Sequence, residues 1–303
     1  MSKKAFIFPG QGAQYPGMGK DFYEAFSIAR ETFEEADDIL GMGLKKCIFE
    51  GPASDLTLTK NSQPAIYIVS MAILRTLLSQ FPDLKPSICA GLSLGEYTAL
   101  TAAGKISFKE ALLLVKARAE YMHEACISHP GTMQVVLGME ETQIEKIITG
   151  NAWVANLNCP GQVVIAGTLL GIEKAAADLK AAGAKRVLPL DVSGAFHSPL
   201  MQDAQDRLTP IIEQTQILDT PIEIVMNVPG DFVKMPADIR KCMIAQVTSC
   251  VRWEKGIRSM GVDTFFEIGC GKTLSGMNKR IGVLGSTTSI EKVADLEGVL
   301  CNY

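Results

Sequence analysis

The sequence predicts an α/β protein with a mostly parallel sheet and a small α/β unit inserted into it. In residues 1–127, apolar segments of strand length alternate with longer segments of helical periodicity, an order that favours a parallel sheet. In residues 128–195 the order changes to strand, helix, strand, strand, helix, strand, which is the ferredoxin-like pattern. Strand-like segments then return. We therefore expect one large domain, built from 1–127 and 196–303, around an inserted domain at 128–195.

The first part of the large domain is predicted to contain two strands and four helices. The strands lie at 4–8 and 87–91, and the helices at 21–40, 64–81, 94–103 and 107–125. Gly104 ends the third helix, because glycine is favoured just after the last helical residue. Ser107 and Glu110 have the spacing of a capping box, which predicts that the fourth helix starts there.

The inserted domain is predicted to follow a loop at 128–131. Its strands lie at 133–137, 153–157, 163–166 and 186–190, and its helices at 140–149 and 169–182. Two further strands, at 222–227 and 264–268, are predicted to return the chain to the larger sheet.

The composition is globular and excludes several classes of protein. Of the 303 residues, 47% are hydrophobic and 20% are charged, which is enough apolar material for a large core. The formal net charge of -4 argues against a nucleic-acid partner, because such proteins usually carry a basic balance. The N-terminal segment has only a short apolar run, and no run approaches the length of a membrane-spanning helix. We therefore expect a cytoplasmic protein without a membrane partner.

The cysteines do not indicate a metal or redox site. None of the eight forms a CxxC pair, so neither a zinc site nor a thioredoxin-like site is predicted. We interpret them as buried thiols in a reducing cytosol. They are Cys47, Cys89, Cys126, Cys159, Cys242, Cys250, Cys270 and Cys301.

Residues 91–95 read GLSLG and match the GxSxG pattern between a predicted strand and a predicted helix. A sharp strand-to-helix turn crowds the backbone, so glycines flank the serine and its hydroxyl is pushed into the open. The N–H groups that follow it lie at a helix N-terminus, where they can stabilise an oxyanion. Ser93 is therefore a candidate nucleophile. The alternative is an ordinary serine at the N-cap of a helix.

One arginine stands alone on an apolar helix face. By the i, i+3, i+4 rule, that face of the helix at 107–125 consists of Ala111, Leu114, Val115, Arg118, Met122 and Ala125. A buried guanidinium needs an anionic partner, and its fork suits a carboxylate. Arg118 is therefore a candidate binding residue for an acidic substrate. It could also form a structural salt bridge or extend its charged end to the surface.

Several further segments resemble the malonyl-CoA:acyl-carrier-protein transacylase family, in the family's order and over nearly the whole chain. They are FPGQGAQYPGMG at 8–19, NSQPAI at 61–66, GLSLGEYTAL at 91–100, NLNCPGQVVIAG at 156–167, SGAFHSPLM at 193–201 and EIGCGKTLSGMNKRI at 267–281. The resemblance implies an α/β-hydrolase-like core with an inserted ferredoxin-like domain. That agrees with the order of elements described above.

The resemblance also implies roles for individual residues. Ser93 would be the nucleophile and His197, in SGAFHSP, its general base. A carbonyl of Gln246 would orient the histidine in place of the acid of a hydrolase triad. The N–H groups of Gln11 and Leu94 would form the oxyanion hole.

Three residues would bind the substrate. Arg118 would hold the free carboxylate of malonyl, Phe196 would favour malonyl over bulkier acyl groups, and Asn158 would face the cleft. Two positions depart from the family pattern: Leu92 replaces a histidine before the nucleophile, and Cys270 replaces a proline. The first departure bears on the geometry and pH response near Ser93.

The remaining titratable residues fit the chemistry less well. Of the three histidines, His123 shares a helix face with charged residues and is expected to be solvated, and His129 lies in the loop between the domains. Asp191 lies close to His197 in sequence but has no pattern of a triad acid around it.

The function that the resemblance implies is transfer of malonyl from malonyl-CoA to the phosphopantetheine thiol of acyl carrier protein, through a serine ester, to supply fatty acid synthesis. It would need no metal or redox cofactor. The alternatives are a serine hydrolase, an acyltransferase for another acyl group, and a non-catalytic binding or scaffold protein. The last would be expected to lose Ser93 or His197, and this chain keeps both. A hydrolase would want an acid partner for its histidine and would have no use for Arg118.

Overall fold

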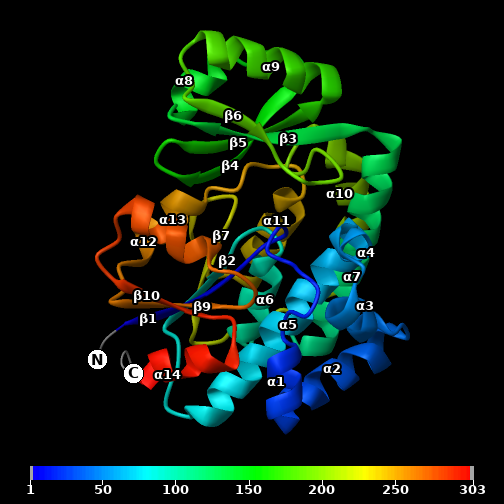
Figure 1. Cartoon of the computed structure of the whole chain (residues 1–303), viewed down its shortest axis with the longest axis vertical. Helices are drawn as coiled ribbons and strands as arrows, with labels where there is room; N and C mark the ends of the chain where they lie inside the picture. The colour runs from blue at the N-terminus through cyan, green and yellow to red at the C-terminus, as the bar shows by residue number, and fades with distance from the viewer. Residues whose placement is uncertain (1–2, 301–303) are drawn as a thin grey trace.

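The computed structural model describes residues 3–300, so Cys301 lies outside the described part of the chain. In that part, a six-stranded sheet has the order β10-β9-β1-β2-β7-β8 (Figure 1). Every neighbouring pair is parallel except β7 and β8. The strands are β1 (Lys4–Phe8), β2 (Ile88–Gly91), β7 (Glu223–Met226), β8 (Asp231–Phe232), β9 (Thr264–Ile268) and β10 (Ser286–Ile290). The predicted α/β fold with a mostly parallel sheet is confirmed.

Helices cover both faces of this sheet, as parallel sheets require. Phe6 and Phe8 of β1 belong to a large apolar core that they share with the long helices, whereas Ala5 and Ile7 point into a second core with α12 and α13. The helices are α1 (Lys20–Ala25), α2 (Ser27–Leu40), α3 (Leu44–Glu50), α4 (Ala53–Thr57), α5 (Thr59–Gln80), α6 (Gly95–Ala102), α7 (Phe108–Ser128), α10 (Gln202–Gln214), α11 (Pro236–Gln246), α12 (Trp253–Met260), α13 (Thr273–Ile281) and α14 (Leu296–Leu300).

A second, antiparallel sheet lies above the first in Figure 1 and has the order β4-β5-β3-β6. Its strands are β3 (Gly131–Leu137), β4 (Ala152–Cys159), β5 (Gln162–Thr168) and β6 (Arg186–Pro189). Two helices, α8 (Glu141–Glu145) and α9 (Leu169–Ala181), pack on one face around a core of their own. The two parts also contact each other through the backbone at Val251, which exchanges hydrogen bonds with Ala155 and Leu157.

The largest departures from the predicted helix bounds occur at three places. The predicted helix at 21–40 is two helices, because Phe26 between them adopts an extended conformation (φ -129°, ψ 129°). The helix predicted at 64–81 begins earlier, at Thr59, and contains Pro64. Pro64 is the sixth residue of this helix, so its missing N–H removes one hydrogen bond, the one that would reach the carbonyl of Lys60. The helix predicted at 140–149 is shorter than expected, because α8 spans only Glu141–Glu145.

All seven described cysteines are free thiols; four are buried, and Cys47, Cys242 and Cys250 are half-buried. Between residues 3 and 300, no helix combines the length and the apolar character needed to cross a membrane.

Candidate active site

Ser93 lies on a tight turn between β2 and α6 and has φ 52°, in the left-handed region that side chains other than glycine rarely adopt. The turn leaves no space for side chains at its ends. A Cβ on Gly91 would lie 1.9 Å from the carbonyl carbon of Gly95, and a Cβ on Gly95 would lie 2.2 Å from the carbonyl oxygen of Phe8. The GxSxG pattern therefore has the steric origin that the sequence indicated, and the serine hydroxyl faces a cavity.

His197 meets Ser93 at this turn. Its Nε2 lies 2.8 Å from Ser93 Oγ, and its Nδ1 lies 2.7 Å from the main-chain carbonyl oxygen of Gln246. A carbonyl only accepts, so Nδ1 carries the proton and Nε2 is free to accept one from the serine. Burial, helped by the positive charge of Arg118 and opposed by the Gln246 carbonyl, lowers the pKa of His197 to about 4. The imidazole is therefore neutral near pH 7.

Arg118 is 1% exposed, and its guanidinium points at the same hydroxyl. It donates to Ser93 Oγ at 3.2 Å, to Gln246 Oε1 at 3.0 Å and to Gln63 Oε1 at 2.5 Å. Its Nε has no partner, and within residues 3–300 it forms no ion pair with a carboxylate. Burial lowers its pKa. The described structure thus contains neither the salt bridge nor the solvent-exposed charge of the two structural alternatives.

The helix face that carries Arg118 is buried along its whole length, as expected from its periodicity. The buried residues of α7 include Ala111, Leu114, Val115, Arg118, Met122 and Ala125.

Two backbone N–H groups beside Ser93 have no hydrogen-bond acceptor in the described part of the chain. One belongs to Leu94, just before α6, and the other to Gln11, in the loop after β1. The side chain of Gln11 is held by Thr59 Oγ1 at 3.3 Å. Both N–H groups are thus available to an anionic oxygen, and the start of α6 adds its dipole.

The cavity at Ser93 encloses about 270 Å³ and is lined from both sheets. Ser93, Arg118 and His197 lie on the side of the larger sheet, and Asn158 faces them from β4. Asn158 is 6% exposed, and its Oδ1 has no hydrogen-bond partner in the structure. Phe196 and Leu92 also line the cavity.

Sequence reasoning did not assign roles to two residues that hold this site together. Asn227, at the end of the predicted strand 222–227, accepts a hydrogen bond from Ser93 N–H and donates to Gly91 O, both at 2.7 Å. Glu96 accepts from the Gln246 side chain at 2.8 Å. The sequence did contain a signal for each residue. Asn227 is a polar residue at the end of an apolar strand, and Glu96 is an acidic residue directly after the GxSxG turn.

The other titratable candidates lie away from Ser93. His129 pairs with Asp203 at 2.9 Å, and Asp191 is exposed and is not among the hydrogen-bond partners of His197. His123, which was expected to be solvated, is half-buried, and its Nδ1 is buried without a hydrogen-bond partner among residues 3–300. Residues 3–300 contain no cluster of three or more His, Cys, Asp or Glu suited to a metal ion.

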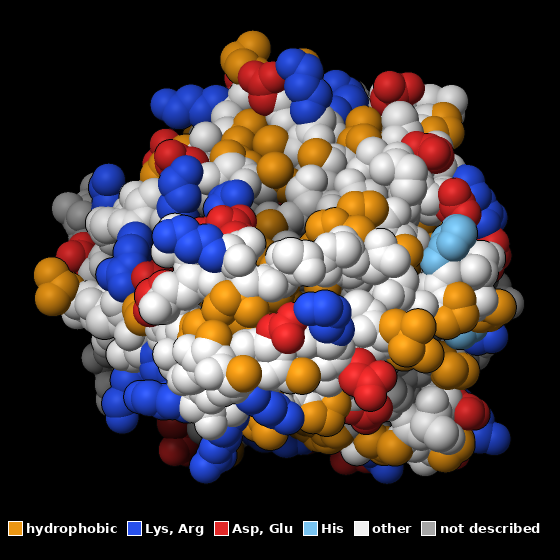
Figure 2. All heavy atoms as spheres, turned by 90° about the horizontal axis from the view of Figure 1, so that it is seen from above, with side chains coloured by type: hydrophobic (Ala, Val, Ile, Leu, Met, Phe, Trp, Pro, Cys, Tyr) orange, Lys and Arg blue, Asp and Glu red, His pale blue; other side chains and the backbone are white. Residues whose placement is uncertain are grey.

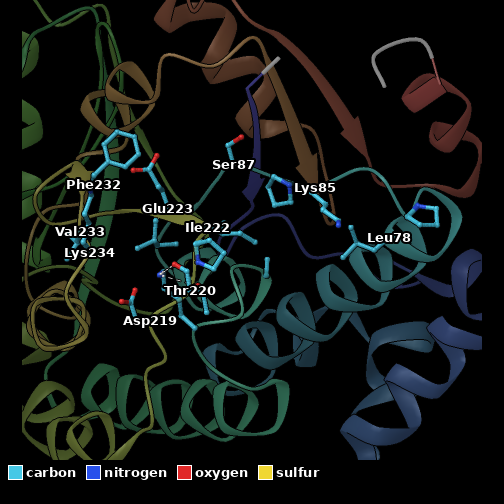
Figure 3. A pocket seen from close by; sticks show the side chains of 16 residues that line it. Leu78, Lys85, Ser87, Asp219, Thr220, Ile222, Glu223, Phe232, Val233 and Lys234 are labelled. Carbon is cyan, nitrogen blue, oxygen red and sulfur yellow. Dashed lines mark hydrogen bonds between the residues drawn. The ribbon is translucent and has the colours of Figure 1, made fainter. Parts of the chain in front are cut away.

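A larger hollow of about 870 Å³ lies at the N-terminal ends of β2 and β7, the ends away from Ser93 (Figure 3). Ser87, Thr220, Glu223 and Phe232 line it. No histidine lines it, so it does not hold a serine–histidine pair. Its volume alone therefore does not make it the reactive site.

The sequence matches the family described as acyl transferase domain over residues 5–274. It is 43% identical to the malonyl CoA-acyl carrier protein transacylase of Bacillus subtilis, over 98% of this chain and 96% of that protein. The chain belongs to the malonyl CoA-acyl carrier protein transacylase family.

Solved structures of this family agree with the fold. An acyl-carrier-protein S-malonyltransferase from Burkholderia pseudomallei superposes with a TM-score of 0.94 at 40% identity, covering 99% of both chains. A malonyl-transacylase solved in complex with a type II polyketide acyl-carrier protein has a TM-score of 0.94 at 38% identity, covering 100% of both chains. Both matches cover the two sheets of this chain.

Proposed function

We propose that this protein transfers malonyl from malonyl-CoA to the phosphopantetheine thiol of acyl carrier protein, through an ester on Ser93, and so supplies fatty acid synthesis. One observation carries the proposal. Ser93 Oγ lies 2.8 Å from His197 Nε2 and 3.2 Å from the guanidinium of Arg118. A nucleophile, a base and a cation for a carboxylate therefore converge on one hydroxyl.

In the first half-reaction, His197 Nε2 takes the hydroxyl proton while Ser93 Oγ attacks the thioester carbonyl carbon. The N–H groups of Gln11 and Leu94 bind the oxyanion. When the C–S bond breaks, the coenzyme A sulfur leaves with the proton from His197. The Gln246 carbonyl holds the imidazole in the required tautomer, although a neutral partner stabilises the imidazolium less than a carboxylate would.

The second half-reaction runs the same steps with a different thiol. His197 takes the proton of the carrier thiol, and its sulfur attacks the serine ester. Ser93 then leaves and recovers the proton. The chemistry uses no electrons from outside and needs no metal.

Arg118 gives the site its acyl preference. Its unpartnered Nε and its lack of a carboxylate partner in the described chain leave it able to bind the malonyl carboxylate. Asn158 would add a polar contact from β4, and Phe196, which is 5% exposed, would limit the size of the acyl group.

The architecture that we propose has a large α/β-hydrolase-like domain at 1–127 and 196–303, and an inserted ferredoxin-like domain at 128–195. The strand order β4-β5-β3-β6, with two helices on one face, supports the second assignment. The reactive groups would then lie on the large domain and Asn158 on the small one. The free thiols support a reducing, cytoplasmic location.

Malonyl-CoA alone should add one malonyl group to the protein, at Ser93, as measured by intact mass and peptide mapping. Ser93→Ala should not be labelled. His197→Ala should be labelled about 10²–10⁴-fold more slowly, because a positioned base contributes that much. His129→Ala is the matched control and should behave as wild type.

Labelling of Ser93→Ala at the wild-type rate would contradict the mechanism. Release of free malonate without a thiol acceptor, as fast as transfer to carrier protein, would instead identify a hydrolase.

A further inference from the structure

Glu96 is a buried acid that the mechanism above does not use. It lies in the first turn of α6, three residues after Ser93, and is 0% exposed. Within residues 3–300 it forms no ion pair. Its two oxygens accept hydrogen bonds instead, Oε1 from Gln246 Nε2 at 2.8 Å and Oε2 from Asn227 N–H at 2.6 Å.

These two partners hold the reactive residues. Gln246 donates from Nε2 to Ser93 O at 2.9 Å and accepts from Arg118 at 3.0 Å, and its main-chain carbonyl accepts from His197. Asn227 accepts from Ser93 N–H. A single intervening residue, Gln246 or Asn227, therefore links the carboxylate of Glu96 by hydrogen bonds to Ser93, and Gln246 links it to His197 and Arg118 as well.

The direction of this network follows from Arg118. A guanidinium has no acceptor, so the amide oxygen of Gln246 must face it and the amide nitrogen must face Glu96. The Gln246 amide therefore lies between a positive group and an acid. Both oxygens of Glu96 face donors, an arrangement that suits the ionised form.

We propose that the charge of Glu96, acting through the Gln246 amide, sets how strongly Arg118 favours an acyl group that carries a carboxylate. The inference rests on the proposed function, because it assumes that Arg118 binds malonyl. Ionised Glu96 balances the guanidinium and repels a second carboxylate at the same place. When Glu96 is neutral, the positive charge of Arg118 is not balanced and attracts the malonyl carboxylate more strongly. Glu96 is thus a positioning and specificity residue that does not touch the substrate itself.

Glu96 can change charge under ordinary conditions. Burial raises its pKa to about 8, against the opposing effects of the Asn227 N–H, the charge of Arg118 and the Gln246 amide. The other titratable or charged groups that face it are Tyr97 of α6, Arg118 of α7 and Cys242 of α11. Burial raises the pKa of Tyr97 to about 12 and that of Cys242 to about 11, so neither titrates near pH 8. The malonyl carboxylate itself stays ionised there.

The test compares malonyl-CoA with acetyl-CoA, because acetyl has no carboxylate. We would measure kcat/KM for acylation of wild-type protein with each thioester on both sides of pH 8. Titration of His197 affects both thioesters alike and cancels in the ratio. The malonyl-to-acetyl ratio should fall as the pH rises through the titration of Glu96. A coupling of one pKa unit between the two carboxylates would change the ratio by about tenfold.

Glu96→Gln keeps the size of the side chain and removes the charge, although its amide nitrogen replaces one of the two acceptor oxygens. Its ratio should therefore not fall as the pH rises through 8. Glu267→Gln is the matched control. Glu267 is also 0% exposed and accepts from the first N–H groups of a helix, Leu274 and Ser275 of α13, but it does not contact Gln246 or Ser93. The Glu267→Gln variant should be less stable than wild type, but its malonyl-to-acetyl ratio and the pH dependence of that ratio should be unchanged.

A wild-type ratio that does not vary with pH would overturn the proposal, and so would a Glu96→Gln variant whose ratio still falls with pH. The wild-type measurement stands even if Glu96→Gln does not fold. Failure of the proposed function has a different signature, since Ser93 would then carry no malonyl group at any pH.

Discussion

Ser93 and His197 are the residues other than glycine in the described chain that have positive φ, at 52° and 55°. Such conformations cost about 1–3 kcal/mol each and persist only where the surroundings enforce them. At Ser93 the enforcing contacts are the glycine turn and the side chain of Asn227, which binds its N–H. The strain therefore falls on the two residues whose side chains meet, and it places the hydroxyl against the imidazole.

At the same scale, Arg118→Ala should separate substrate binding from structure. Loss of one partner of a buried ion pair costs about 3–5 kcal/mol, and each 1.4 kcal/mol is tenfold. Malonyl transfer should therefore fall by roughly two to three and a half orders of magnitude, while acetyl transfer holds steady or rises. The measurement is kcat/KM for malonyl-CoA and acetyl-CoA, with melting temperatures recorded beside it.

Arg75→Ala is the matched control for that experiment. Arg75 pairs with Glu35 and stacks on the ring of Phe108, away from the cavity, so its loss should lower stability and leave the malonyl-to-acetyl ratio unchanged. If Arg118→Ala behaves in the same way, with both acyl groups affected equally, Arg118 has only a structural role.

At the scale of elements, β2, the turn and α6 form one unit whose shape depends on close backbone contact. The Leu92 N–H donates to Phe8 O on β1 at 3.0 Å, and Gly95 passes against the same residue. The start of α6 thus lies directly over the end of β1, beside the loop that carries Gln11. This approach brings the two N–H groups of the proposed oxyanion hole to one place.

Gly95→Ala should disrupt that unit. Its Cβ would lie 2.2 Å from Phe8 O and 2.9 Å from Pro9 O, and these are backbone atoms that cannot move aside alone. We expect a loss of about 1–3 kcal/mol in the free energy of unfolding, with a larger loss in acylation rate because the turn must shift. Denaturant unfolding and the rate of Ser93 labelling measure the two effects.

Gly276→Ala on α13 is the control, because a Cβ there meets nothing within 4 Å. It should be neutral or stabilise the protein by up to about 1 kcal/mol, since alanine is the better helix former. Equal behaviour of the two variants would show that close approach at the turn is unimportant.

At the scale of the molecule, the cavity lies between two sheets, and α13 of the larger part lies beside it. Thr273, Leu274 and Met277 of α13 line the cavity, and Arg280 donates to Gln162 of β5. Seen from above, Figure 2 shows Lys and Arg side chains gathered toward the left of the molecule, with acidic side chains among them.

The family resemblance implies an acidic carrier protein, whereas this chain has a net charge of -4, so attraction would need a local basic patch. The sequence suggests Lys185, Arg186, Lys272, Lys279 and Arg280, all of which are exposed. Lys272 is paired with Asp295, which leaves it less able to contribute. Transfer to carrier protein should therefore weaken with added salt more than transfer to free pantetheine.

Lys279→Ala should reduce that difference in salt dependence, whereas Lys174→Ala, on α9 and paired with Asp178, should not. Steady-state rates with the two acceptors at several salt concentrations provide the measurement. Equal salt dependence for both acceptors would dismiss the patch.

The amino-acid sequence alone determined the features that depend on neighbours along the chain. The strand–turn–helix at Ser93 follows from glycines two residues either side of it, and the buried face of α7 follows from helical periodicity. The family resemblance pointed to His197 and Gln246, which no local pattern would have chosen. The break at Phe26 and the short α8 escaped prediction, because helix ends depend on what packs against them.

Only the tertiary structure decided how the site is held. The bonds from Ser93 to His197, Asn227 and Gln246 join residues that lie 104, 134 and 153 positions apart. Whether Arg118 meets a carboxylate or two amides, and whether Glu96 meets a cation or two N–H groups, also depends on such distant segments. Periodicity specifies which face of an element is buried, but not which polar group lies opposite it. That choice is made when the helices and strands pack together.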